Sequence, residues 1–342
     1  MMIKWLLRAA DTLLDQLILP SYTWPGYALR ALTWNSANVE QDMTGQVCLI
    51  TGANAGLGLA TAERLARLGA TVYMVARSLE RGSRARDQVI AKTGNDRVHL
   101  AVLDVSDLTA VTQFVAQFRQ QENRLDVLIN NASVLLPQRQ TSVDGLEQTL
   151  ATNLIGPFLL TNLLVPLLQA SAPARIIWVS SGGMYTQKLD IDMFHTANEP
   201  YNGTTAYAQT KRAQIVLTEL MAERLAGSGV TVNAMHPGWV DTPGVQSSLP
   251  TFRKVMRLGL RSAHQGADTI VWLAAAPQPA HISGQFWFDR RARGTHKFYL
   301  NTRSSDAERR QLWAECQRLS ASDGLRPMDT KPARSSPLQG TS

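Results

Sequence analysis

The stretch Thr51-Gly-Ala-Asn-Ala-Gly-Leu-Gly58 decides the fold that this sequence predicts. It follows an apolar run, Gln46-Val-Cys-Leu-Ile-Thr51, that is typical of a short buried strand. It leads into residues 57–68, where apolar side chains recur at spacings of three and four, so we expect a helix there. A strand, a glycine turn and a helix in this order predict a site where backbone N–H groups and the helix dipole bind a dinucleotide pyrophosphate.

Each glycine of this turn has an expected task. Gly52 permits the tight turn, Gly56 lets the backbone approach the pyrophosphate, and Gly58 lets the helix pack on the sheet. We count Asn54 and Leu57 with them as cofactor-binding residues. The spacing is G-x-x-x-G-x-G rather than G-x-G-x-x-G, and alone it would also fit an ordinary loop, so the flanking strand and helix carry the interpretation.

The end of the second expected strand, residues 71–76, bears on the choice of dinucleotide. Arg77 follows it where a carboxylate would bond the ribose 2′-hydroxyl of NAD and repel a 2′-phosphate. Arg77 therefore favours NADP(H), with NAD as the alternative cofactor. Glu80 lies close enough to complicate this preference, and Arg77 alternatively solvates the start of a helix.

A second constellation follows later in the chain, at Tyr207-Ala-Gln-Thr-Lys211 on a segment with helical periodicity. Residues four apart share a helix face, and an ammonium near a phenol stabilises the phenolate and lowers the pKa of that phenol. Tyr207 is therefore the candidate acid/base. Ser181 ends a strand-like run, residues 175–180, and is expected to aim its hydroxyl at the same cleft.

These residues together resemble the classical short-chain dehydrogenase/reductase family, from about Gly45 to about Asp289. The resemblance rests on the glycine turn, Asp104, Asn130-Asn-Ala132, Asn153, Ser181, Tyr207 with Lys211, and His236-Pro-Gly-Trp-Val-Asp-Thr242. It implies an oxidoreductase that transfers a hydride between NADP(H) and a carbonyl or alcohol.

The resemblance also implies a catalytic tetrad. Tyr207 is the acid/base, Lys211 bonds the nicotinamide ribose and lowers the pKa of the tyrosine, Ser181 polarises the carbonyl, and Asn153 supports a proton relay through water. A hydroxyl donor and a proton donor must converge on one oxygen, because hydride transfer to a carbonyl develops an alkoxide there.

Further cofactor contacts are implied by the same resemblance. Asp104 bonds the adenine, Asn131 lies beneath the adenosine ribose with Ala132 beside it, and Thr242 contacts the carboxamide or phosphate. Ser133 departs from the family pattern, which has glycine there, and we expect altered packing around the cofactor ribose.

The rest of the chain predicts one α/β domain. The length of 342 residues and the hydrophobic content of 44% suffice for one large core. Strands are expected at about 46–51, 71–76, 98–103, 125–130, 174–180, 230–235 and 285–288, with helices between them. This alternation predicts a single Rossmann-type, doubly wound parallel sheet with helices on both faces. We assign residues 1–44 to an amphipathic N-terminal extension, 45–318 to the catalytic domain and 319–342 to a disordered tail.

Composition indicates the surroundings of the protein. Only Cys48 and Cys316 occur, in an expected strand and an expected helix, which suits a reducing compartment and a cytoplasmic location; no metal site is expected. The net charge of +7 comes without a nucleic-acid-binding motif, so no nucleic acid partner is expected. The oligomeric state is left open.

The N-terminal extension carries an apolar helical face, and two interpretations stay open. The helix packs on the domain or on a partner subunit, or it lies on a membrane surface as a peripheral contact. The apolar side chains of this face are Ile3, Leu6, Leu7, Ala10, Leu13, Leu14, Leu17 and Ile18.

Substrate choice is expected in residues 244–261, an apolar segment with interleaved arginines that lies over the cleft in similar enzymes. An amphipathic lid suits a lipophilic carbonyl or alcohol, although any helix packed on a domain shows this pattern. A catalytically weak dinucleotide sensor or scaffold is the alternative function. A nucleotide-sugar epimerase is disfavoured by the glycine spacing.

Overall fold

The computed structural model describes residues 11, 12, 14, 15, 17–35, 39–195, 200–297 and 300–321. Its centre is an eight-stranded sheet in the order β3-β2-β1-β4-β5-β6-β7-β8. The strands are β1 (Val47–Thr51), β2 (Thr71–Ala76), β3 (Val98–Val102), β4 (Val127–Asn130), β5 (Ala174–Val179), β6 (Val230–Met235), β7 (Phe286–Phe288) and β8 (Arg291–Arg293). Strands β1 to β7 pair in parallel, which confirms the predicted sheet.

Strand β8 was not predicted. It pairs antiparallel with β7 through a tight turn in which Asp289 and Arg290 adopt positive φ values of 50° and 57°. Its sequence, Arg-Ala-Arg, has no apolar run, and its turn has no glycine, so neither usual sign of a hairpin is present.

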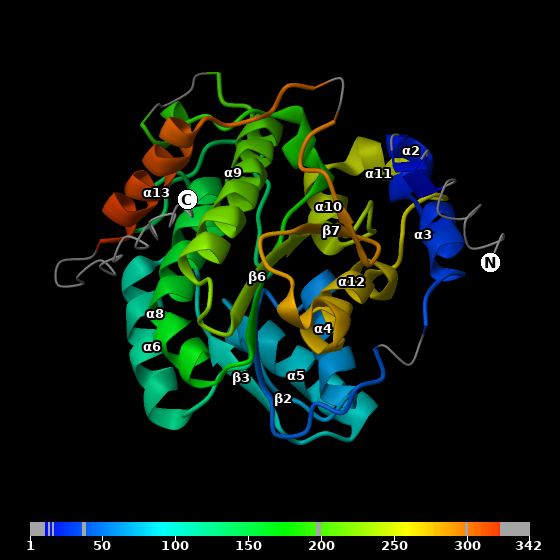
Figure 1. Cartoon of the computed structure of the whole chain (residues 1–342), viewed down its shortest axis with the longest axis vertical. Coiled ribbons are helices and arrows are strands. Elements are labelled where there is room, and N and C mark those ends of the chain that lie inside the picture. Colours follow the sequence, from blue (N-terminus) through cyan, green and yellow to red (C-terminus); the bar gives the residue numbers. More distant parts are fainter. Residues whose placement is uncertain are drawn as a thin grey trace, which may run out of the picture.

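Helices cover both faces of the sheet, as predicted (Figure 1). One face carries α6 (Leu108–Gln121), α8 (Gly156–Ala170) and α9 (Gly203–Arg224), and α13 (Asp306–Ser320) packs against α8 and α9. The other face carries α4 (Gly56–Arg67), α5 (Leu79–Thr93) and α12 (Ala263–Ala275). The remaining short elements are α7 (Gln148–Leu150), η2 (Ala151–Ile155), η3 (Gly182–Thr186), η4 (Asp192–Phe194), α10 (Pro243–Ser248), α11 (Pro250–Met256) and η5 (Gln278–His281).

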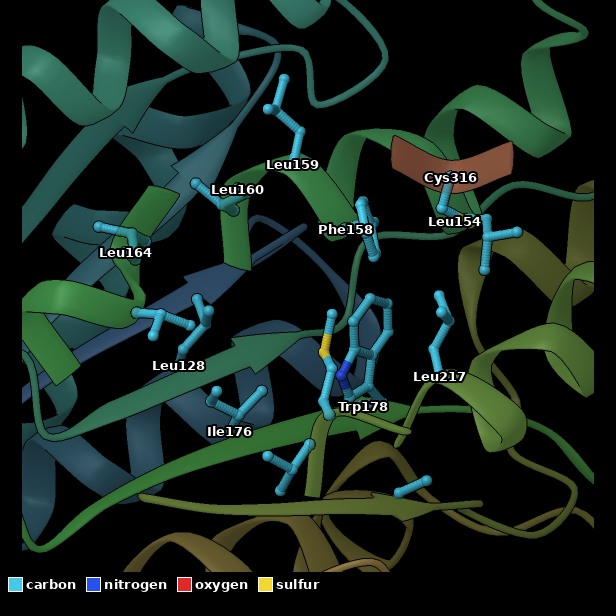
Figure 2. Close-up of a cluster of buried hydrophobic side chains, with 14 of the residues drawn as sticks. Leu128, Leu154, Phe158, Leu159, Leu160, Leu164, Ile176, Trp178, Leu217 and Cys316 are labelled. Carbon is cyan, nitrogen blue, oxygen red and sulfur yellow. The ribbon is translucent and has the colours of Figure 1, made fainter. Parts of the chain in front are cut away.

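The larger apolar core lies between the sheet and the α8–α9 layer. Figure 2 shows the indole of Trp178, on β5, facing Phe158 of α8 and Leu217 of α9. Trp178 and Leu217 have no exposed surface. Burying one such side chain contributes about 1.5–3 kcal/mol, so this layer fixes the position of α9 against the sheet.

One helical stretch of the described chain, Gln148–Ala170, is long and apolar enough to cross a membrane. However, 83% of it is buried inside the protein, as expected of a core helix that combines α7, η2 and α8. Cys48 in β1 and Cys316 in α13 are both buried and unpaired.

The described part of the N-terminal extension packs on the catalytic domain. It forms α2 (Ile18–Tyr22) and α3 (Trp24–Ala31). Arg30 forms a buried ion pair with Asp289 at 2.8 Å, and Arg261 binds the same carboxylate at 2.6 Å. Tyr22 is also buried, with its ring 4.5 Å from that of His236.

The expected apolar face of residues 3–18 lies mostly outside the described residues, and the expected tail does so from residue 322 on. Nearer the domain, Asp11 bonds Arg293 and Arg30. Burial opposes ionisation of Asp11, but these bonds prevail and lower its pKa to about 2. The division of the chain at residues 44 and 318 stays a prediction.

Candidate active site

The glycine turn lies at the carboxyl end of β1, as expected. Gly52 and Gly56 have φ values of +66° and +53°, which other residues adopt only with strain. A Cβ atom on Gly52 would lie 2.9 Å from the Cα of Ala132. A Cβ on Gly58 would lie 2.4 Å from the carbonyl oxygen of Gly52, so this glycine lets α4 fold back on the turn itself. The turn therefore requires glycine for both conformation and space.

The first turn of α4 is suited to an anion. Among the described residues, no side chain caps this turn and no acidic residue lies in it. The neighbouring helices α5 and α6 are capped by Ser78 and Asp107. The uncapped N–H groups of a helix start need partners, and a pyrophosphate is a suitable one. The turn thus fits the expected dinucleotide.

Asn131 and Ala132 bind the turn from β4. The Asn131 side-chain amide donates to the carbonyl oxygens of Thr51 at 2.8 Å and Gly52 at 3.2 Å. The backbone N–H groups of Asn131 and Ala132 both donate to Thr51 Oγ1. Asn131 therefore holds the shape of the turn, a positioning task that the expected contact with the ribose did not include.

Thr242 also lies at the turn, although it is almost 200 positions away in sequence. A Cβ on Gly56 would be 3.3 Å from Thr242 Cγ2. The Thr242 hydroxyl accepts a hydrogen bond from the N–H of Val245 and so caps α10. Leu57 extends the contacts of the turn, since its Cδ2 would be 2.6 Å from a Cβ on Gly266 in α12.

The expected adenosine contacts follow β2 and β3. Arg77 is exposed just beyond β2. Glu80, which complicated the preference for NADP(H), forms an ion pair with Arg84 one helical turn later. Asp104, after β3, accepts hydrogen bonds from the N–H and hydroxyl of Ser106 at 3.0 and 2.7 Å.

The hydroxyl of Tyr207 lies at the carboxyl ends of β4 and β5. The side chains of Ser181, as expected, and of Ser133 lie close enough to this hydroxyl to influence its pKa. Burial raises the pKa of Tyr207, and the two serine contacts oppose this shift. The Oγ of Ser181 accepts from the N–H of Gly183 at 3.2 Å, which leaves its own proton free to be donated.

Ser133 has a neighbour that was not expected. It departs from the family's glycine, and its expected effect on packing around the ribose stays a prediction, but its side chain also lies close to the Tyr207 hydroxyl and lowers the pKa of that phenol. In the sequence, the available signal was the serine in place of the family's glycine. The direction of the Ser133 side chain depends on how the loop after β4 packs against α9.

Lys211 lies on the same helix as Tyr207, one turn later, and its Nζ is 5.4 Å from the centre of the tyrosine ring. The Nζ donates to the carbonyl oxygen of Val179 at 2.9 Å. Burial lowers the pKa of Lys211 to about 7. The pKa of Tyr207 is raised overall, because burial of the phenol outweighs the lowering by the neighbouring serines, and the expected lowering by Lys211 stays a prediction.

Asn153 lies in η2, a single π-helical turn between α7 and α8. Its side chain is fully engaged: Oδ1 accepts from the N–H of Val134 at 2.8 Å, and Nδ2 donates to the Val134 carbonyl and to Thr210 Oγ1. A π-helical turn leaves a backbone carbonyl outside the regular hydrogen-bond pattern of an α-helix. The freed carbonyl of Asn153 faces α9.

Gln214 binds that carbonyl and was missed in the sequence. Its Nε2 donates to the Asn153 carbonyl at 2.6 Å, and its Oε1 accepts from Lys211 Nζ at 3.4 Å. The Gln214 side-chain amide therefore links Lys211 to the Asn153 carbonyl, and the expected water relay at Asn153 stays a prediction. Gln214 follows Lys211 by three residues and shares its helix face, which was the available signal.

The fold agrees with the comparisons. A family model described as short chain dehydrogenase matches residues 46–251. The chain belongs to the short-chain dehydrogenase family and is an NAD(P)-dependent oxidoreductase.

Individual relatives cover most of the chain. Dehydrogenase/reductase SDR family member 12 of Bos taurus is 42% identical over 295 residues, which are 86% of this chain and 92% of that protein. Retinol dehydrogenase 13 of Homo sapiens is 37% identical over 297 residues, or 84% of this chain and 88% of that protein. A crystal structure of an uncharacterized protein from Mycobacterium paratuberculosis superposes with a TM-score of 0.66 and 28% identity, covering 84% and 97% of the two chains.

Proposed function

We propose that this protein transfers a hydride between NADP(H) and a lipophilic carbonyl or alcohol, with Tyr207 as the acid/base. The observation that carries the proposal is the meeting of the Tyr207 phenol with the Ser181 side chain and the Lys211 ammonium, whose Nζ lies 5.4 Å from the centre of the tyrosine ring, at the sheet edge that also holds the glycine turn. Two O–H donors can therefore meet one substrate oxygen beside the bound dinucleotide.

In carbonyl reduction, the cofactor and each of the two side chains have separate roles. Bound NADPH supplies the hydride to the carbonyl carbon. Ser181 donates a hydrogen bond to the carbonyl oxygen, and Tyr207 gives that oxygen its proton. The raised pKa of Tyr207 keeps the phenol protonated at neutral pH, which suits the direction of carbonyl reduction.

The preference for NADP(H) rests on charge at the end of β2. Arg77 is exposed where the 2′-phosphate would lie, and Glu80 is engaged by Arg84 rather than directed alone at this position. An arginine bonds a phosphate with charge-assisted hydrogen bonds.

The preference for a lipophilic substrate rests on the segment after Thr242. Helices α10 and α11 follow Thr242 directly in the chain. Phe252 of α11 packs on Trp239, with ring centres 5.1 Å apart. A relative that carries the name retinol dehydrogenase, a name that refers to an apolar alcohol, agrees with this preference.

Binding and turnover can be tested separately. The protein is titrated with NADPH and with NADH by tryptophan quenching, and NADPH oxidation is then followed over a panel of aldehydes and ketones. We expect tighter NADPH binding and turnover of apolar carbonyls. Binding without any turnover would favour the sensor, and no binding of either dinucleotide would contradict the whole proposal.

A further inference from the structure

The outward side of α2 and α3 is apolar throughout. Every exposed residue from 17 through 32 is uncharged and apolar, and the one charged residue in this range, Arg30, is buried. Leu19 is 59% exposed and Leu32 is 75% exposed. The exposed residues are Leu17, Ile18, Leu19, Pro20, Trp24, Pro25, Leu29 and Leu32. Single exposed apolar residues are common, but a contiguous set of this kind marks an interaction surface.

The segment around α11 extends this surface. The indole Nε1 of Trp24 donates to the carbonyl oxygen of Leu258 at 2.9 Å, and its backbone N–H donates to Gly259 at 3.0 Å. Helices α2, α3 and α11 accordingly lie together at one end of the molecule (Figure 1). Val255 and Leu258 are 76% and 84% exposed. We call these two residues and the exposed residues of 17–32 the apolar face.

Positive charge accompanies the apolar face. Lys254 and Arg257 are exposed on either side of Val255. No acidic residue occurs from 17 to 35 or from 242 to 262. Asp15 and Asp241, which flank these two segments, are paired with Lys297 at 3.1 Å and with Arg253 at 2.8 Å. The surface therefore combines apolar side chains with uncompensated cations.

The inward side of the same helices is rigidly held. Arg30 and Arg261 share the Asp289 carboxylate, and Arg261 also donates to the carbonyl oxygen of Ser21 at 2.9 Å. All these charged groups are buried. The apolar face is thus presented by a fixed scaffold and cannot turn inward without breaking buried ion pairs.

We infer that the apolar face docks the protein on a lipid bilayer with anionic headgroups. Apolar side chains of an interfacial helix enter the boundary between headgroups and acyl chains, while lysine and arginine bind anionic lipids. The apolar face shares only Leu17 and Ile18 with the expected apolar side of residues 3–18, and its other residues come from 19–32 and from α11 and the turn after it. It does not rest on the proposed function, because vesicle binding is measured without substrate or turnover.

The test is co-sedimentation of the full chain with vesicles of phosphatidylcholine alone or with phosphatidylserine added. We expect binding to the anionic vesicles. The double variant Leu32→Glu/Leu258→Glu should weaken it at least tenfold, because each leucine loses its transfer from water and gains a charge. Leu79→Glu is the matched control, because Leu79 is 64% exposed on α5, outside the apolar face. This variant should bind the vesicles as the unchanged protein does.

The charges are tested by Lys254→Glu/Arg257→Glu. Each cation near an anionic surface contributes a factor of about fivefold, so this variant should lose the preference for phosphatidylserine. Equal binding of the unchanged protein to both kinds of vesicle would overturn the assignment to anionic lipid.

Two results would overturn the docking surface itself. Full vesicle binding by Leu32→Glu/Leu258→Glu would place the contact elsewhere on the chain. A dimer in sedimentation equilibrium that this variant dissociates, without vesicle binding by the unchanged protein, would show that a second copy covers the apolar face.

Discussion

The two ends of the candidate active site are built by different means. At the cofactor end, the glycine turn depends on backbone shape, with positive φ values at Gly52 and Gly56 and an uncapped helix start. At the chemical end, Tyr207 and Lys211 depend on buried side chains whose pKa values are shifted by desolvation. The cofactor end should therefore be sensitive to any added Cβ, and the chemical end to changes of charge and hydroxyl groups.

The largest effect is expected at the chemical end. Tyr207→Phe removes the proton donor and leaves the ring in place, so turnover should fall about 10²- to 10⁴-fold while NADPH still binds. Steady-state kinetics and a quenching titration measure the two quantities. Full activity of the variant would refute the acid/base assignment.

The next effect concerns backbone shape. Gly52→Ala forces a side chain into positive φ, a cost of about 1–2 kcal/mol, and against the Cα of Ala132. We expect NADPH affinity to fall on the order of a hundredfold, because the turn must move. Gly94→Ala is the matched control, since Gly94 has φ +71° with open space around it. The control should lower the free energy of unfolding by about 1 kcal/mol and leave cofactor affinity unchanged. An equal loss of NADPH affinity in both variants would contradict the idea that binding depends on the close packing of Gly52 in the turn.

A smaller effect separates the two dinucleotides. Arg77→Glu replaces a cation by a carboxylate at the end of β2, so the Kd for NADPH should rise about 10- to 100-fold and that for NADH much less. Arg81→Glu, further along α5, serves as the comparison. Equal losses for both cofactors would reject the contact with the 2′-phosphate.

At the chemical end, Gln214 should affect pH dependence. We expect kcat/KM to fall as the pH rises through about 7, where Lys211 loses its charge. Gln214→Glu places a carboxylate beside Nζ, which favours the ammonium, so this fall should move about one pH unit higher. Gln214→Leu removes both hydrogen bonds without adding charge, so it should not raise the pH at which kcat/KM falls. An unchanged profile in the glutamate variant would reduce Gln214 to a packing role.

The smallest effect is expected for Ser133. The Ser133 side chain lowers the pKa of Tyr207, so Ser133→Gly should raise that pKa. Alcohol oxidation, which needs the phenolate, should then set in about half a pH unit higher. Ser133→Thr keeps a hydroxyl and should behave like the unchanged protein. A profile that does not move in the glycine variant would show that this contact has no part in the chemistry.

The sequence predicted the elements of this protein well where the signal is local. Strands β1 to β7 are apolar runs between turn residues, and the glycine turn stands between such a run and an amphipathic helix, so residue order alone identified them. The proximity of Tyr207 and Lys211 also followed from their spacing on one helix face, whereas the full tetrad was implied by the family resemblance and stays a prediction. The cytoplasmic location and the lipophilic substrate stay predictions.

Tertiary structure decided the contacts between residues far apart in the chain. The contacts of Gln214 with Asn153 and of Arg30 with Asp289, and the proximity of Ser133 to Tyr207, join different elements. Periodicity within one element carries no information about such pairs. The direction of the Tyr207 pKa shift was also decided there. A motif shows that an ammonium is near a phenol, but the pKa depends on how completely the surrounding fold removes water from both groups.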